Sequence, residues 1–228
     1  MIGAVLFDLD ETLFDRTGSL RDFLADQHRR HAPLHGAGPE DYVETFLKLD
    51  RRGKTAKSIV YPRLLEALGV AQPSLPSVLN DEYEQDFWRF ARAFDGLEQL
   101  LADLDRRRLP VGIVTNGRTR GQTATISALS LDRLSGTCLI SESEGVRKPD
   151  PEMFLRAAAR LAVDPTDCVF IGDDPHADIV GAKQAGMRTI WFSNGVSWPE
   201  DLPERADADA SSLPQVLDVL DGWLPLER

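Results

Sequence analysis

The sequence predicts an α/β fold, a Rossmann-like parallel sheet with helices on both faces, into which an all-helical segment is inserted. Short apolar runs rich in β-branched and aromatic residues occur at 3–7, 111–115, 137–140, 168–172 and 189–193. These runs are continuous rather than alternating, as in strands that are buried on both faces of a parallel sheet. Helix-like segments separate the later runs, and this alternation of strand and helix is typical of doubly wound domains.

The first run, GAVLF, is followed by a long segment without strand character. Apparent amphipathic helices occupy this segment instead: TGSLRDFLADQHRR, PEDYVETFLKLDRR, YPRLLEALG and PSVLNDEYEQDFWRFARAF. The change of pattern predicts two domains. We expect residues 1–15 and 94–228 to form the α/β core and residues 16–93 to form a helical cap domain.

The second half of the chain returns to the α/β rhythm. Leucines at helical spacing cover 97–104, and a second helix is expected over 154–161 after the turn signal KPDPE. A third covers 179–185, where Gly186 is suited to the position just past a helix end. After Asp201 the chain is acidic and alanine-rich, and one last helix is expected over 213–224, LPQVLDVLDGWL.

Composition limits the partners. The net charge of the 228-residue chain is -11, so it would repel a nucleic-acid polymer, although a small anion bound locally is compatible with it. Cys138 and Cys168 stand among apolar residues, which favours reduced thiols over a disulfide. The N-terminal run lacks a basic flank and is too short to span a membrane. We expect a cytoplasmic protein without a membrane partner; its oligomeric state is not predicted.

Polar groups follow the predicted strands, where ligands of open α/β sheets bind. Asp8 and Asp10 end the first run, and their spacing places both side chains on one side of an extended backbone while Leu9 points away. Two such carboxylates can carry chemistry if one stays ionised and the other holds a proton. The alternative is a surface turn that opens the insert.

Two further groups are ambiguous in isolation. Thr115, Asn116 and Gly117 follow VGIV and could donate hydrogen bonds to an oxyanion, or could form an ordinary turn and helix cap. Lys148 lies in RKPDP and could neutralise a bound anion, or could be a solvated lysine ahead of a helix.

The segment after the fourth run, GDDPHADI, contains three carboxylates. Asp174 is suited to cap the next helix and Asp178 to favour its positive end, while His176 is expected at the surface. This leaves Asp173 without a structural role. Together with Asp8 it offers the hard oxygen ligands that Mg²⁺ prefers.

Taken together, FDLDETLF, VTNG, RKPDPEMF and IGDDPHADI resemble the four motifs of the haloacid dehalogenase-like (HAD) hydrolase superfamily, in the order that family has them. The resemblance spans about residues 2–195. The helical segment between the first two motifs is similar to the α-helical cap of one subgroup. The resemblance implies a hydrolase of phosphoric monoesters.

The resemblance also implies roles for individual residues. Asp8 would be the nucleophile that forms an aspartyl-phosphate, and Asp10 would protonate the leaving alkoxide and then activate water. Thr115 and Asn116 would bind the phosphoryl oxygens. Lys148 would offset the charge of the nucleophile and the phosphate.

A metal site is implied as well. Mg²⁺ would be held by Asp8, by the main-chain carbonyl of Asp10 and by Asp173. Asp178 would orient these ligands without being one of them, with Asp174 as an alternative for that role.

Other functions stay open. Asp10 argues against a dehalogenase, because halide needs no protonation; a phosphomutase or a non-catalytic phosphate-binding protein remains compatible. A signalling receiver module is about half this length and has no helical insert. A sugar phosphate, a nucleoside monophosphate or a glycolate-like phosphate could each be the substrate.

Basic residues of the insert raise a further alternative. The segment RRGKTAK either contacts an anionic or hydroxylated substrate or is a solvated turn between helices; its basic residues are Arg51, Arg52, Lys54 and Lys57. Arg118 and Arg120 present the same two alternatives. Residues 14–16, where the chain leaves the core, are candidates for a hinge or pocket wall.

Overall fold

The computed structural model describes residues 2–132, 137–202 and 204–223. The chain forms two compact units, one of Met1–Asp15 with Ala93–Arg228 and the other of Arg16–Arg92. That the second unit acts as a cap remains a prediction.

The first unit is built on a parallel sheet that has six strands in the described residues, in the order β3-β2-β1-β4-β5-β6. All pairings are parallel, which confirms the predicted fold class. The strands are β1 (Ala4–Phe7), β2 (Val111–Thr115), β3 (Thr137–Ile140), β4 (Cys168–Gly172), β5 (Arg188–Phe192) and β6 (Ala208–Ala210). The last of these was not predicted, because three residues with a central aspartate show no strand pattern.

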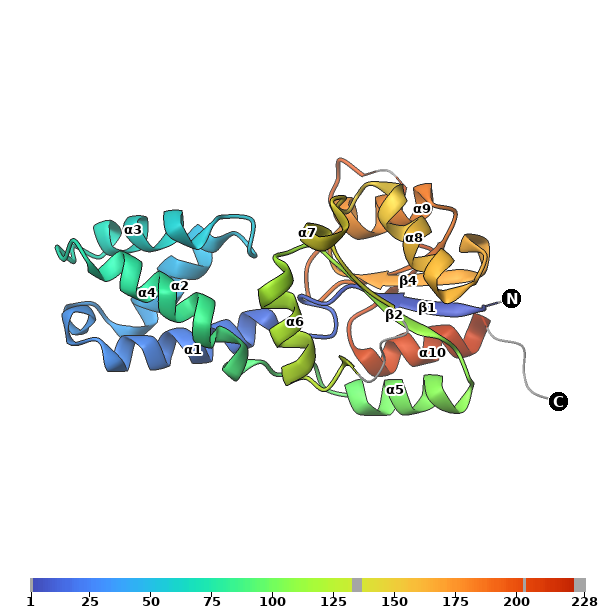
Figure 1. Ribbon diagram of the computed structural model, residues 1–228, viewed down its shortest axis with the longest axis horizontal. Helices are drawn as coiled ribbons and strands as arrows, with labels where there is room; N and C mark the ends of the chain where they lie inside the picture. Colours follow the sequence, from blue (N-terminus) through green and yellow to red (C-terminus); the bar gives the residue numbers. More distant parts are fainter. Residues whose placement is uncertain (1, 133–136, 203, 224–228) are drawn as a thin grey trace. The chain divides into compact units, whose positions relative to one another are not determined.

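Helices cover both faces of this sheet. Figure 1 shows α8 (Pro151–Leu161) and α9 (Val180–Gln184) on one face, and α5 (Leu97–Arg106) and α10 (Leu213–Trp223) on the other. The predicted last helix is present, and its final residue, Leu224, lies outside the described residues. The other helical elements described in this unit are α6 (Thr119–Ala128), α7 (Ser141–Glu144), η4 (Pro165–Asp167) and the π-helical turn η5 (Pro175–Ile179).

The core explains why β1 reads as a continuous apolar run. Successive strand residues point to opposite faces, and all four residues of β1 are buried. Leu6 belongs to a cluster with Phe154 of α8 and Phe170 of β4, whose rings meet edge to face with centroids 4.8 Å apart. Because both faces are packed, the end of β1 is a rigid platform for the residues that follow.

The second unit consists of α1 (Arg16–Arg30), η1 (Ala32–Gly36), α2 (Pro39–Asp50), α3 (Lys57–Ala67), α4 (Leu75–Asp86) and η2 (Phe87–Phe90). No strand forms between residues 16 and 92, all of which the structure describes. Phe23 anchors its apolar core, with edge-to-face contacts to Tyr83, Phe87 and Phe90.

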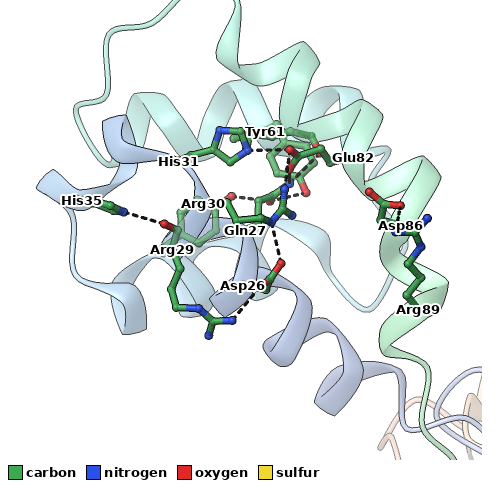
Figure 2. A network of polar contacts seen from close by, with 12 residues as sticks. Asp26, Gln27, Arg29, Arg30, His31, His35, Tyr61, Glu82, Asp86 and Arg89 are labelled. Atoms are coloured by element: carbon green, nitrogen blue, oxygen red, sulfur yellow. Dashed lines mark hydrogen bonds and ion pairs between the residues drawn. The ribbon is translucent and has the colours of Figure 1, made fainter.

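A buried polar network crosses this apolar core (Figure 2). The Gln27 side-chain oxygen accepts hydrogen bonds from the hydroxyls of Tyr42 (2.8 Å) and Tyr61 (3.0 Å). Its amide nitrogen donates to the Leu79 carbonyl and to Glu82, both at 3.1 Å. Buried polar groups cost free energy unless they are bonded. Gln27 therefore ties α1, α2, α3 and α4 together.

The basic segment 51–57 divides into two parts. Arg51, Arg52 and Lys54 are exposed, and both arginines have left-handed backbone angles, with φ of 51° and 56°. Exposure at these three positions is compatible with a turn between helices, and a contact with substrate stays a prediction for them. The expectation of a solvated turn is wrong for Lys57, which is buried and forms an ion pair with Asp50.

Asp50 is the centre of a buried charge cluster. Its carboxylate lies 2.5 Å from Lys57 Nζ and 2.9 Å from Arg16 Nη1, and it also accepts from the main-chain N–H of Gly53 at 2.7 Å. Burial alone would raise the pKa of Asp50, but Arg16 and Lys57 outweigh burial and hold it below its ordinary value. Arg16 is thus a structural residue of the helical unit.

Replacing Asp50 with Ala is expected to destabilise the protein by about 3–5 kcal/mol, because Arg16 and Lys57 would lose their buried counter-charge. Urea unfolding of the full chain measures this loss in the free energy of unfolding. Asp81→Ala, at an exposed position of α4, is the matched control. Equal losses in the two variants would contradict the assignment.

Candidate active site

The sheet brings the polar strand ends together. Strand β1 pairs with β2 and β4, in a register that aligns Phe7 with Ile113 and with Ile171. Asp8 follows β1 directly, and its N–H donates to the Ile171 carbonyl at 2.8 Å. Strand order reverses between β1 and β4, the point of an open α/β sheet where ligands bind.

A buried lysine joins two aspartates at this point. Lys148 Nζ lies 2.5 Å from Asp8 Oδ1 and 2.7 Å from Asp178 Oδ1. The exposed fractions are 5% for Asp8, 3% for Lys148 and 1% for Asp178. The alternative of a solvated Lys148 is therefore wrong, as is that of a surface turn at Asp8.

The electrostatics of this group follow from burial. Burial raises the pKa of Asp178 to about 7, although Lys148 acts in the opposite direction. Burial also raises the pKa of Asp8, against Lys148 and with a further contribution from Asp10. The pKa of Lys148 is raised as well, because Asp178 and Asp8 outweigh its own burial. The single ammonium group of Lys148 therefore forms ion pairs with two carboxylates, whose ionised forms are disfavoured by burial and by each other.

A third carboxylate completes a candidate metal centre. Asp8, Asp173 and Asp178 each offer an oxygen, and these oxygens lie within 4.8 Å of one another. With Lys148 the set has a formal charge of about −2 when all three are ionised, which a divalent cation would neutralise. The donor set therefore fits Mg²⁺.

The loop after β4 holds Asp178 in place. Its carboxylate accepts from the main-chain N–H of Asp174 at 3.0 Å. A Cβ atom at Gly172 would lie 2.4 Å from Asp178 Oδ2, so only glycine fits there. Asp174 itself accepts from the N–H groups of His176 and Ala177, which confirms the expected helix cap.

Asn116, which directly follows the end of β2, hydrogen-bonds the main chain of Lys148. The Asn116 side chain donates to the Lys148 carbonyl and accepts from the Lys148 N–H, both at 2.9 Å. Its carboxamide thus fixes the main chain that carries Lys148, and its expected contact with the phosphoryl group stays a prediction. Gly117 N–H donates to Ser141 Oγ at 3.0 Å, which fixes the segment after β2 to α7.

Gln122 of α6 is a site residue that sequence reasoning missed. Its Nε2 lies 2.6 Å from Thr115 Oγ1 and 3.2 Å from Asp10 Oδ2. No sequence signal marked it, because a single glutamine carries no pattern of its own.

The remaining candidates differ in exposure. Arg118, Arg120 and His176 are exposed. Cys138 and Cys168 are free thiols, as expected. Among the described helices, none has the combined length and apolar content that crossing a bilayer demands.

Comparison with known sequences gives consistent results. The model of the haloacid dehalogenase-like hydrolase family matches residues 2–186. Glyceraldehyde 3-phosphate phosphatase of Pyrococcus furiosus is 31% identical over 96% of this chain and 93% of its own. N-acetylmuramic acid 6-phosphate phosphatase of Pseudomonas aeruginosa is 31% identical over 96% and 94%.

Solved structures share the fold. The HAD hydrolase YfnB from Bacillus subtilis, determined bound to magnesium, superimposes with a TM-score of 0.76 at 22% identity, covering 96% of this chain and 99% of that one. A 2-haloacid dehalogenase from Pseudomonas syringae pv. Tomato has a TM-score of 0.61 at 32% identity, with coverage of 98% and 100%.

Proposed function

Because the chain belongs to the haloacid dehalogenase-like hydrolases, we propose that it is a Mg²⁺-dependent phosphatase of small phosphate monoesters that works through an aspartyl-phosphate. The observation that carries the proposal is the buried Asp8–Lys148 pair, with Asp10 two residues beyond the nucleophile. Relatives named as phosphatases over nearly their whole length support it.

In the first step, a carboxylate oxygen of Asp8 attacks phosphorus and the bond from phosphorus to the ester oxygen breaks. Asp10 gives its proton to the departing oxygen. In the second step, Asp10 takes a proton from water, which attacks the phosphorus and releases Asp8 and inorganic phosphate. Each step is easier than direct hydrolysis.

The surrounding residues stabilise the charge that moves in these steps. Lys148 faces the nucleophile and offsets the negative charge of the phosphoryl group, while Thr115 donates its hydroxyl hydrogen to a phosphoryl oxygen. The proposed ligands of Mg²⁺ are the carboxylates of Asp8 and Asp173 and the main-chain carbonyl of Asp10. Asp178 lies beside the two carboxylates and supports them. When bound, the ion supplies charge neutralisation for carboxylates and phosphate together.

Asp10 also decides against carbon–halogen cleavage, despite the dehalogenase among the similar structures. A departing halide needs no proton, whereas an alkoxide does. A phosphomutase would use the same first step but return the phosphoryl group to a sugar. A non-catalytic phosphate-binding protein would bind the ester without turnover.

The names of the relatives indicate a substrate class. Those proteins act on glyceraldehyde 3-phosphate, N-acetylmuramic acid 6-phosphate and phosphoglycolate. We expect a small phosphorylated sugar or hydroxy acid here, acted on in the cytoplasm. The helical unit, residues 16–92, is the proposed cap that selects the leaving group.

A panel of phosphate esters, assayed for inorganic phosphate with Mg²⁺ and with EDTA, tests the proposal. Release with Mg²⁺ and its loss in EDTA are expected. A requirement for a sugar bisphosphate, with isomerised product, would point to the mutase instead. Absence of phosphate release across the panel would refute the phosphatase.

Magnesium is expected to raise the melting temperature more at about pH 8 than at about pH 5.5. The raised pKa values of Asp8 and Asp178 mean that these groups favour the folded state when protonated. For Asp178 this contribution is lost as pH rises from the unfolded pKa of about 4 through the folded pKa of about 7, and the contribution of Asp8 is lost in the same direction. At low pH, Mg²⁺ must compete with protons for the carboxylates of Asp8 and Asp178. At high pH, where both are ionised, the bound ion reduces the repulsion between them.

Thermal unfolding with Mg²⁺ and with EDTA at both pH values measures this difference. Asp173→Asn should remove most of the shift, and Asp105→Asn, at an exposed position of α5, should keep it. A shift of equal size at both pH values, or one that survives Asp173→Asn, would argue against a carboxylate-held metal.

A further inference from the structure

Gln122 connects two groups of the site that are far apart in the sequence. It stands in α6 and is only 8% exposed. Its amide nitrogen reaches Thr115 Oγ1 at 2.6 Å and Asp10 Oδ2 at 3.2 Å. One side-chain group therefore contacts both the residue expected to donate to the phosphate and the residue expected to move the proton.

The loop before α6 leaves room for this side chain. A Cβ atom at Gly117 would lie 2.8 Å from Gln122 Cγ and 3.0 Å from its Cδ, which is closer than packed carbon atoms approach. The Gln122 N–H also donates to the Arg118 carbonyl at 3.0 Å, in the first turn of the helix. The position of Gln122 is thus set by its helix and by a glycine that no other residue could replace without a shift.

The chemistry of the amide assigns the hydrogen bonds. An amide nitrogen only donates, and Asp10 Oδ2 accepts whenever it carries no proton, so in this arrangement the nitrogen is the atom that faces Asp10. Thr115 Oγ1 must then accept from the same nitrogen. Since a hydroxyl has a single hydrogen, that of Thr115 is directed to a different acceptor.

We propose that Gln122 is a positioning residue, which orients the Asp10 carboxyl for proton transfer and the Thr115 hydroxyl for donation to a phosphoryl oxygen. The inference rests on the proposed phosphatase function. With Oδ2 of Asp10 accepting from Gln122, the transferable proton resides on Oδ1. In this role Gln122 acts through Asp10 and Thr115 and not on the substrate directly.

Leaving-group dependence distinguishes this role from a purely structural one. Phenol has a pKa of about 10, like a tyrosine side chain, and needs protonation as it departs, whereas the more acidic 4-nitrophenol needs much less. In Gln122→Met, kcat/KM is expected to fall about 100-fold for phenyl phosphate but only about 10-fold for 4-nitrophenyl phosphate. The smaller, common loss reflects Thr115, which serves both esters.

Two further variants complete the test. Gln122→Glu keeps the shape of the side chain but replaces both N–H donors with a carboxylate, whose charge repels the phosphate of either ester. It should therefore lower both rates further, with the rate for phenyl phosphate still falling about 10-fold more, even if the Met variant folds poorly. Gln99→Met, at an exposed position of α5, should leave both rates unchanged.

The outcomes separate the two proposals. If the wild-type protein released phosphate from neither ester, the phosphatase function itself would fail. If the wild type cleaves both esters and a folded Gln122 variant loses the two rates by equal factors, the positioning role is wrong. Melting temperatures of all variants identify those that are folded.

Discussion

Asp8→Asn is expected to lower phosphate release from 4-nitrophenyl phosphate by about 10⁴-fold or more, the scale of loss when a covalent nucleophile is removed. The asparagine amide keeps the size of the carboxylate but cannot form the aspartyl-phosphate. Initial rates with Mg²⁺ measure the effect.

The fold is expected to survive this change. Ionised Asp8 is disfavoured by its burial, and Lys148 keeps its second partner, Asp178, at 2.7 Å. The melting temperature should therefore stay within about 4 °C of the wild type, a shift of about 1 kcal/mol for a chain of this length. Asp105→Asn is the matched control and should retain full activity. Turnover that persisted in Asp8→Asn would remove the nucleophile from the mechanism.

Lys148→Met is expected to affect both activity and stability. The rate should fall by about 10²- to 10³-fold, because charge on the nucleophile and phosphate would lose its buried counter-ion. Removal of one partner of a buried ion pair also costs about 3–5 kcal/mol of unfolding free energy. Steady-state kinetics and urea unfolding measure the two losses separately.

The stability loss in Lys148→Met should depend on pH. Without the ammonium, the folded-state pKa values of Asp8 and Asp178 rise further, so each carboxyl favours the folded state only when protonated. The loss is therefore expected to be larger at about pH 8 than at about pH 5. Lys183→Met, whose surface ion pairs join Glu204 and Asp207, should cost at most about 1 kcal/mol. A pH-independent loss in Lys148→Met would contradict the buried pairing.

The sheet could be predicted because its strands are buried on both faces. The runs at 111–115, 137–140 and 168–172 coincide with β2, β3 and β4. Strand β6 could not be predicted, since its three residues, Ala208–Ala210, are placed by pairing with β5 and not by an apolar pattern.

The residues of the candidate site could be predicted in part, because the carboxyl ends of parallel strands lie at the same edge of the sheet. Asp8, Lys148 and Asp173 were expected at one edge of the sheet, and the structure brings them together. The side-chain pairings within the site were not predictable. The Asn116–Lys148 contact joins residues 32 positions apart, and the Gln122–Asp10 contact joins residues 112 apart; neither pairing follows from periodicity or composition.

The burial of the basic residues at 51–57 could not be predicted from the sequence either. Arg51, Arg52 and Lys54 are exposed, but Lys57 is buried against Asp50. Charge alone does not distinguish a surface lysine from a buried one, because the counter-charge comes from the preceding helix. Charge reversal at Lys57 would therefore report on stability rather than on substrate binding.

Covalent capture of the phosphoryl group tests the central claim most directly. Wild-type protein mixed with 4-nitrophenyl phosphate and Mg²⁺, quenched in acid within one turnover and digested, should yield an Asp8 peptide heavier by one phosphoryl group. The same peptide from Asp8→Asn should stay unmodified. Phosphate release without any phosphorylated Asp8 peptide, or phosphorylation at a different residue, would contradict the account.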